Sequence, residues 1–187
     1  MRIFSNFDTN LEKQLIAWYA EWFGASEVIS IHRSRLYFYH HVVLQYVFWL
    51  ILVWISIYPI YMYEYPYKEI LIYIYRWFVA VYFFVVMSRA NKAYVDYSMD
   101  FLIVTPKEIV KYNQEWVLHR ETENIPASKI KSISVKKDGF INSFFDIGSI
   151  VFLAEWNDEK WDIVMEFIDA VEHTEKKIKH VLGLDRL

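Results

Sequence analysis

The residues of this chain that could carry chemistry are histidines, a lysine cluster and two polar residues inside apolar runs. His40 and His41 are adjacent, and paired imidazoles near a membrane can ligate haem or a metal ion. Neighbouring residues on a helix point about 100° apart, so both rings cannot serve one site without a second supplier of ligands. We interpret them as amphipathic residues of a membrane interface, and the sequence predicts neither a metal nor a cofactor.

Motifs of known enzymes are absent from the sequence. It has no Walker loop, no nucleophile elbow, no Gly-x-Gly-x-x-Gly turn and no His-Glu-x-x-His helix. It also has no cysteine, which excludes disulfides, thiolate nucleophiles and Cys-based metal sites. The acidic residues Asp158, Glu159 and Asp162 lie beside an expected strand turn, where charge ordinarily faces solvent. The sequence therefore favours a protein that is not an enzyme.

The densest basic cluster consists of Lys129, Lys131, Lys136 and Lys137. It could contact anionic lipid headgroups, contact a partner protein or simply face solvent. The surrounding region, residues 91–187, has more Asp and Glu than Lys and Arg, so an anionic surface repels it on average. The net charge of −3 for the whole chain also argues against nucleic acid as a partner.

Two long apolar runs dominate the first half of the chain. Residues 36–63 contain no Lys, Arg, Asp or Glu, and residues 70–88 contain only Arg76. About 20 helical residues cross the ~30 Å hydrocarbon core of a bilayer. The sequence therefore predicts a transmembrane hairpin over residues 36–90, with spans at about 42–62 and 70–88.

Gln45 and Arg76 are the notable polar residues within these spans. Arg76 would lie roughly 10 Å inside the outer end of its span, where it must snorkel to the headgroups or find an acidic partner on another subunit. A pair with Gln45 is geometrically poor, because Gln45 belongs to the opposite end. A redox or transport subunit that uses His40, His41 or Arg76 is one open interpretation.

Positive residues near the ends of the spans predict the orientation. Arg33, Arg35, Arg89 and Lys92 flank the hairpin, whereas the connecting loop holds only Lys68. Lys and Arg concentrate on the cytoplasmic side of membrane proteins. We expect a multi-pass protein of the inner cell membrane with both termini in the cytoplasm.

Residues 1–35 form a separate N-terminal segment in this prediction, an amphipathic helix followed by a juxtamembrane stretch. Thr9 and Glu12 have the spacing of a capping box, and Gly24 is a natural terminator. Trp18 and Trp22 belong to an aromatic face. That face could lie in the inner leaflet, or it could dock onto the soluble domain or a neighbouring subunit.

Residues 91–187 show mainly the period-two alternation of strands, which we expect at 93–99, 101–105, 108–112, 115–120, 130–137, 149–156 and 161–167. The helical period returns only at the end, where Val171 and Ile178 share a face. The prediction is an α+β protein, in which the two-helix hairpin is followed by an antiparallel β-barrel or sandwich closed by a C-terminal helix.

Three segments of this region resemble the bacterial pleckstrin-homology-like (PH-like) domain of small membrane-flanked proteins. They are the strand–turn–strand pattern at 101–110, the Ile-Pro-x-x-Lys-Ile-x-x-Ile pattern at 125–133 and the glycine-marked loop at 139–150. Residues 26–33 are similar to that family's approach to its hairpin. The resemblance implies the fold and membrane association, and it implies no enzyme activity.

These features together predict a non-enzymatic bacterial inner-membrane protein that presents a PH-like module to the cytoplasm. Its expected partners are the lipid bilayer and either further copies of itself or other membrane subunits, for which it acts as scaffold or accessory. Trp18 and Trp22 are the candidate partner contacts. The alternative is an anionic-lipid or phosphate sensor that uses the four clustered lysines.

Overall fold

The computed structural model describes residues 10–62, 67–116, 119–155 and 162–184. The chain divides into two compact units. One unit is Leu36–Tyr94, and the other combines Met1–Arg35 with Val95–Leu187. Residues on both sides of the hairpin therefore build one β-domain, whereas the sequence analysis separates residues 1–35 from it.

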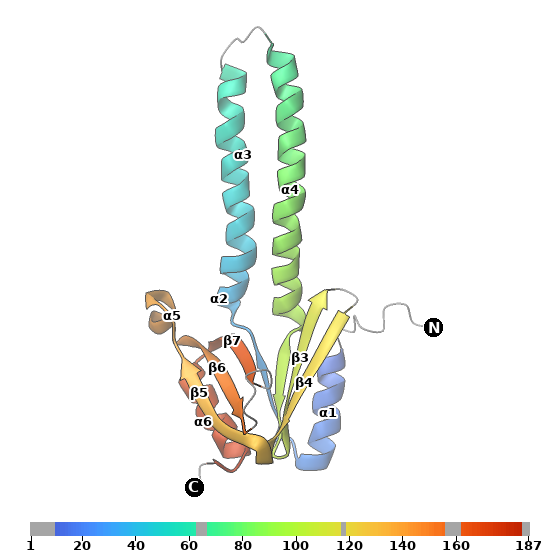
Figure 1. Ribbon diagram of the computed structural model, residues 1–187, viewed down its shortest axis with the longest axis vertical. Coiled ribbons are helices and arrows are strands. Elements are labelled where there is room, and N and C mark those ends of the chain that lie inside the picture. The colour runs from blue at the N-terminus through green and yellow to red at the C-terminus, as the bar shows by residue number, and fades with distance from the viewer. Residues whose placement is uncertain (1–9, 63–66, 117–118, 156–161, 185–187) are drawn as a thin grey trace, which may run out of the picture. The chain divides into compact units, whose positions relative to one another are not determined.

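The first unit is a pair of long helices, drawn side by side in Figure 1. It begins with α2 (Arg35–Phe38) and a π-helical turn (Tyr39–Val43), which lead into α3 (Leu44–Met62) and then α4 (Lys68–Met99). With 19 and 32 residues, α3 and α4 measure about 28 Å and 48 Å. Both are thus long enough to cross a bilayer.

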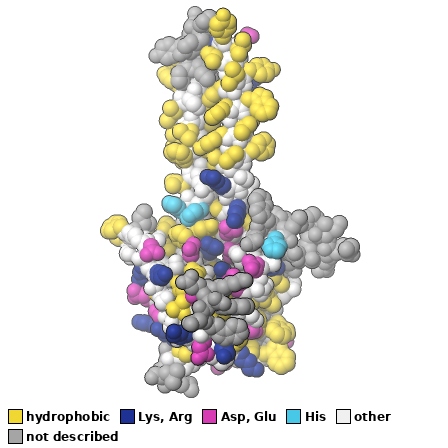
Figure 2. Space-filling view, in the orientation of Figure 1, with side chains coloured by type: hydrophobic (Ala, Val, Ile, Leu, Met, Phe, Trp, Pro, Cys, Tyr) yellow, Lys and Arg dark blue, Asp and Glu magenta, His cyan; other side chains and the backbone are white. Residues whose placement is uncertain are grey.

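The apolar side chains of these helices point outward. Trp54, Trp77 and Phe84 each leave more than 70% of their surface exposed, and Figure 2 shows apolar side chains covering the hairpin. The core helix of a soluble protein would bury such residues. Two helices are therefore apolar and long enough to span a membrane.

The expected strand at 93–99 is wrong, because Ala93–Met99 is the last part of α4. No glycine or proline interrupts the chain between residues 67 and 99. A helix propagates cheaply once it has formed, so the aromatic and β-branched residues near its end do not terminate it.

The second unit contains two antiparallel sheets. The four-stranded sheet has the order β1-β2-β3-β4, and its strands are Ile29–His32, Phe101–Val104, Glu108–Trp116 and His119–Pro126. The three-stranded sheet has the order β5-β6-β7, and its strands are Ile130–Lys136, Ile147–Ala154 and Ile163–Asp169. Its helices are α1 (Leu11–Phe23), α5 (Phe140–Phe144) and α6 (Val171–Val181), with one 3-10 turn at Ala127–Lys129.

These elements confirm the mixed α+β prediction with antiparallel strands and a C-terminal helix. A closed barrel is not formed by the described strands, because β4 and β5 belong to different sheets. The 3-10 turn between them redirects the chain and breaks the ladder. The expected turn at residues 157–160 lies outside the described residues.

The main core lies between the two sheets and α6. Leu102 from β2, Phe152 from β6 and Ile178 from α6 are fully buried in one cluster. Strand β2 is buried along its whole length, because Phe101 and Ile103 face a second cluster beneath α1. A strand covered on both faces reads as a continuous apolar run rather than an alternating one.

Strand β1 makes the hairpin an insertion between two neighbouring strands. It pairs antiparallel with β2, with Ile31 opposite Leu102 and His32 opposite Phe101. The segment expected as a juxtamembrane approach is therefore an edge strand of the sheet. Because β1 and β2 flank the apolar helices in sequence, the two ends of the insertion are held side by side.

Candidate interaction surfaces

Helix α1 is docked on the four-stranded sheet. Tyr19 is 7% exposed and packs in a cluster with Phe101 and Ile103, and its hydroxyl donates to Glu108 Oε1 at 3.1 Å. Burial, with the nearby Glu108 carboxylate, raises the pKa of Tyr19. The sequence allowed α1 to lie in the inner leaflet or to dock onto the soluble domain or a neighbouring subunit. In the structure, α1 docks onto its own β-domain.

Glu12 joins α1 to β1 through its side chain. Its Oε1 accepts from Ser30 Oγ at 2.7 Å and lies 2.8 Å from His32 Nε2. The N-cap residue is Asn10, which makes no side-chain cap, and Thr9 of the predicted capping box lies outside the described residues. The carboxylate serves tertiary structure because β1 brings two polar side chains within its reach.

The outer side of α1 carries two exposed tryptophans, which we call the tryptophan face. Trp18 is 52% and Trp22 is 71% exposed, with ring centroids 6.2 Å apart. They lie one turn apart, so they present one continuous apolar surface. Buried Tyr19 and the partly buried Leu15, Ile16 and Phe23 pack the opposite side of α1 against the domain.

A second aromatic surface lies on the connection between β5 and β6. Phe140, Phe144 and Phe145 are all more than half exposed, and Figure 1 shows α5 at the end of the three-stranded sheet. We call these three side chains the phenylalanine face. The glycine-marked loop predicted for residues 139–150 therefore contains a short helix, for which the four-residue spacing of Phe140 and Phe144 is a signal.

Two of the four lysines on and around β5 are paired with acidic side chains. Lys129 Nζ lies 3.8 Å from Glu155 Oε2. Lys137 Nζ lies 2.6 Å from Asp146 Oδ1 and 2.7 Å from Glu172 Oε1, and these hydrogen bonds raise the pKa of Lys137. This pairing reduces the attraction of the cluster for an anionic surface. The members that pair with no carboxylate among the described residues are Lys131 and Lys136.

A buried polar network joins the residues that flank the hairpin. Arg33 donates to Asp100 Oδ2 at 2.9 Å, and Asp100 Oδ1 accepts from the Gln114 backbone N–H at 2.8 Å. Gln114 Oε1 in turn accepts from Arg120 Nε at 2.9 Å. Burial raises the pKa of Asp100, although Gln114 and Arg33 both oppose that shift. Each member is hydrogen-bonded to another member, so we assign this network a structural role.

The polar residues of the hairpin are not brought together as a pair. Arg76 lies on an outer groove of α4 with Glu69, whereas Gln45 shares a pocket between α3 and α4 with Arg89. In the sequence, Arg89 indicates only the orientation of the hairpin. Its proximity to Gln45 depends on how the two helices face each other, which local sequence does not reveal.

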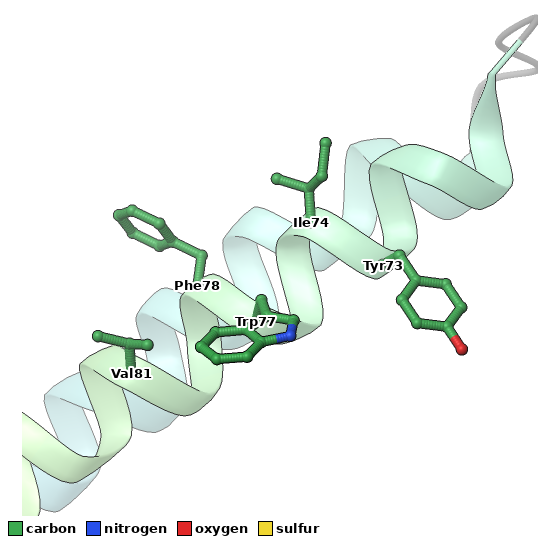
Figure 3. Close-up of a pocket in the computed structure, with 5 residues that line it drawn as sticks. All are labelled: Tyr73, Ile74, Trp77, Phe78 and Val81. Carbon is green, nitrogen blue, oxygen red and sulfur yellow. The ribbon is translucent and has the colours of Figure 1, made fainter.

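The remaining candidates offer no reactive centre. The His40 and His41 rings lie 4.7 Å apart, and no group of three or more His, Asp or Glu side chains in the described parts could hold a metal ion. An apolar groove of about 470 Å³ runs along α4, and Figure 3 shows that its side chains project outward from one helix. Its residues are Tyr73, Ile74, Trp77, Phe78 and Val81.

Comparisons of this chain with protein-family models, with curated proteins and with solved structures find no match. The function must therefore be argued from the surfaces described above. These surfaces can bind, because large exposed aromatic areas lie on a domain whose buried polar side chains are hydrogen-bonded to one another.

Proposed function

We propose that this protein is a non-enzymatic, membrane-anchored module that assembles with itself or serves as scaffold or accessory subunit of a membrane complex. The observation that carries the proposal is the tryptophan face, which is exposed on a helix whose other side is packed against the domain. Tryptophan is enriched among the residues that dominate binding energy at protein interfaces.

Membrane anchoring is supported by the two outward-facing apolar helices. In the proposed orientation both termini lie in the cytoplasm, since four of the five Lys and Arg residues near the helix ends lie outside the connecting loop. A bacterial inner membrane follows from the PH-like resemblance.

The PH-like assignment of the β-domain is supported by the order of its elements. Seven antiparallel strands followed by one amphipathic C-terminal helix agree with what the resemblance implies. Val171 and Ile178 of α6 are fully buried against the sheets, as expected for a helix that covers the core. The resemblance implies no enzyme activity, so the PH-like assignment is consistent with a non-catalytic role.

A protein partner accounts best for the tryptophan face. Two large rings on consecutive turns expose apolar area that a soluble surface rarely leaves contiguous. The lysine cluster favours a lipid partner less, because Lys129 and Lys137 are already paired with carboxylates.

The test is the native mass of the gently solubilised particle and the identity of its components. A multiple of the 22.7 kDa chain supports self-assembly, and further polypeptides at a fixed ratio support an accessory role. We expect Trp18→Ala with Trp22→Ala to release the partner. The matched control is Lys13→Ala with Gln14→Ala, which changes two exposed polar residues of the same helix. A particle of unchanged mass and composition in the tryptophan variant would contradict the proposal.

A further inference from the structure

A pocket of about 170 Å³ lies between α3 and α4. Gln45, Phe48 and Trp49 line it from α3, at positions one turn apart, and Tyr82, Val86 and Arg89 line it from α4. All six residues belong to the hairpin unit. The pocket combines apolar walls with four side chains that can donate hydrogen bonds, Gln45, Trp49, Tyr82 and Arg89.

Within the described residues, none of Gln45, Trp49 and Arg89 has a hydrogen-bond acceptor. The Trp49 indole Nε1 is shielded from solvent and makes no hydrogen bond. In the described parts of the chain, Arg89 forms no ion pair and Gln45 makes no hydrogen bond. Arg89 is exposed and Gln45 is half-buried, so the Trp49 N–H is the buried donor of the set. A buried donor without an acceptor is costly, and in native proteins it usually has a partner such as water, an ion or a ligand.

The donor set suits an anion with several oxygen atoms. An arginine guanidinium presents a planar fork of N–H groups that matches two phosphate oxygens. The indole can only donate, and the Gln45 amide can donate as well. A carboxyl group on the protein could serve the same purpose, but none lines this pocket.

The position of the pocket points to the source of the phosphate. Arg89 directly follows the apolar run 70–88, and Gln45 is the second residue of α3. In a bilayer this is the level where hydrocarbon gives way to headgroups. Basic pockets between membrane helices on the cytoplasmic side bind acidic headgroups, and Phe48 and Val86 would contact the start of an acyl chain.

We propose that Gln45, Trp49 and Arg89 form a binding site for a phosphate group, supplied by an anionic phospholipid of the inner leaflet. The lipid source rests on the membrane anchoring proposed above, whereas the phosphate chemistry does not. This site is independent of the tryptophan face and of the lysine cluster on the β-domain.

The experiment measures lipid retained by the full-length protein in neutral detergent, by native mass spectrometry. Phosphatidylglycerol, phosphatidylcholine and inorganic phosphate are added separately and in competition. We expect one phosphatidylglycerol to be retained in preference to phosphatidylcholine. Arg89→Gln should weaken its retention by about tenfold to a hundredfold, the effect of losing a hydrogen bond to a charged group.

Two variants distinguish a specific binding site from non-specific electrostatic attraction. Arg89→Lys keeps the charge but loses the fork, so it should restore retention only in part. Lys92→Gln removes an equal charge from an exposed residue three positions further along α4, and it should leave retention unchanged. Equal losses in Arg89→Gln and Lys92→Gln, or equal retention of both lipids, would overturn the site. Displacement of the lipid by millimolar inorganic phosphate would overturn the lipid source. Loss of the partner in the tryptophan variant, measured separately, bears on the proposed function alone.

Discussion

Arg33 and Asp100 meet at 2.9 Å across a separation of 67 residues, and between them in the sequence lies the entire apolar hairpin. Asp100 is 2% exposed, and its second oxygen is held by the Gln114 N–H. Strands β1 and β2 run beside each other at the same place. The ion pair therefore fastens the point at which the chain leaves the β-domain to the point at which it returns.

Removing Arg33 should be far more damaging than removing an exposed lysine. Arg33→Ala leaves the Asp100 carboxylate buried without its cation, which we expect to lower the free energy of unfolding by about 3–5 kcal/mol. Lys129→Ala, which breaks an exposed pair with Glu155, should cost at most about 1 kcal/mol. Urea unfolding of the solubilised protein measures both, and similar costs in the two variants would contradict the fastening role.

Asp100 should also make stability depend on pH in the acidic range. Burial raises its folded-state pKa above the ordinary value of 3.8. The folded chain thus keeps a proton that the unfolded chain has released, and this contribution is complete below pH 3.8 and lost as pH rises through the folded-state pKa. Asp100→Asn removes the titrating group and should abolish this pH-dependent loss of stability. The free energy of unfolding of the variant should therefore increase relative to that of the wild type as pH rises. Urea unfolding at a series of acidic pH values measures the difference, and parallel profiles would contradict the expectation.

Adjacent residues of α1 should separate stability from binding. Tyr19→Ala removes a buried ring and its hydrogen bond to Glu108, and we expect a loss of about 3–5 kcal/mol. Trp18→Ala removes a largely exposed ring and should change stability by no more than about 0.5 kcal/mol. Hydrogen exchange of the α1 amides would reveal the difference as faster exchange in the tyrosine variant only. Comparable exchange in both variants would show that α1 is not held by Tyr19.

Gly148 is required by close packing rather than by its backbone angles. A Cβ atom at this position would lie 2.7 Å from the Lys136 carbonyl oxygen and 2.9 Å from Val171 Cγ1. Since the first of these is backbone, the neighbours cannot yield cheaply, and Gly148→Ala should cost about 1–3 kcal/mol. Ser149→Ala, the next residue of β6, is the control for thermal unfolding. An unchanged midpoint for Gly148→Ala would mean that β5 and α6 can move away from β6.

The local patterns of the sequence were sufficient for several elements. Long uncharged runs indicated α3 and most of α4, and Val171 and Ile178 indicated the buried face of α6. Period-two alternation indicated most of the strands after Asp100. These inferences succeed because helix hydrogen bonds are local and because apolar residues in a half-buried helix or strand recur with the period of that element.

Only the tertiary structure decided which distant segments meet. It paired β1 with β2, joined Arg33 to Asp100, turned Glu12 toward Ser30 and His32, and placed Gln45 opposite Arg89. Strand pairing and polar contacts of this kind depend on partners far away in the chain, and those partners leave no local period. The sequence by itself therefore determined which stretches are apolar helix or strand, whereas the fold determined that the hairpin is an insertion within one β-domain. The reason is that the chain must satisfy every buried strand edge and charge, and only the folded arrangement shows which groups do so.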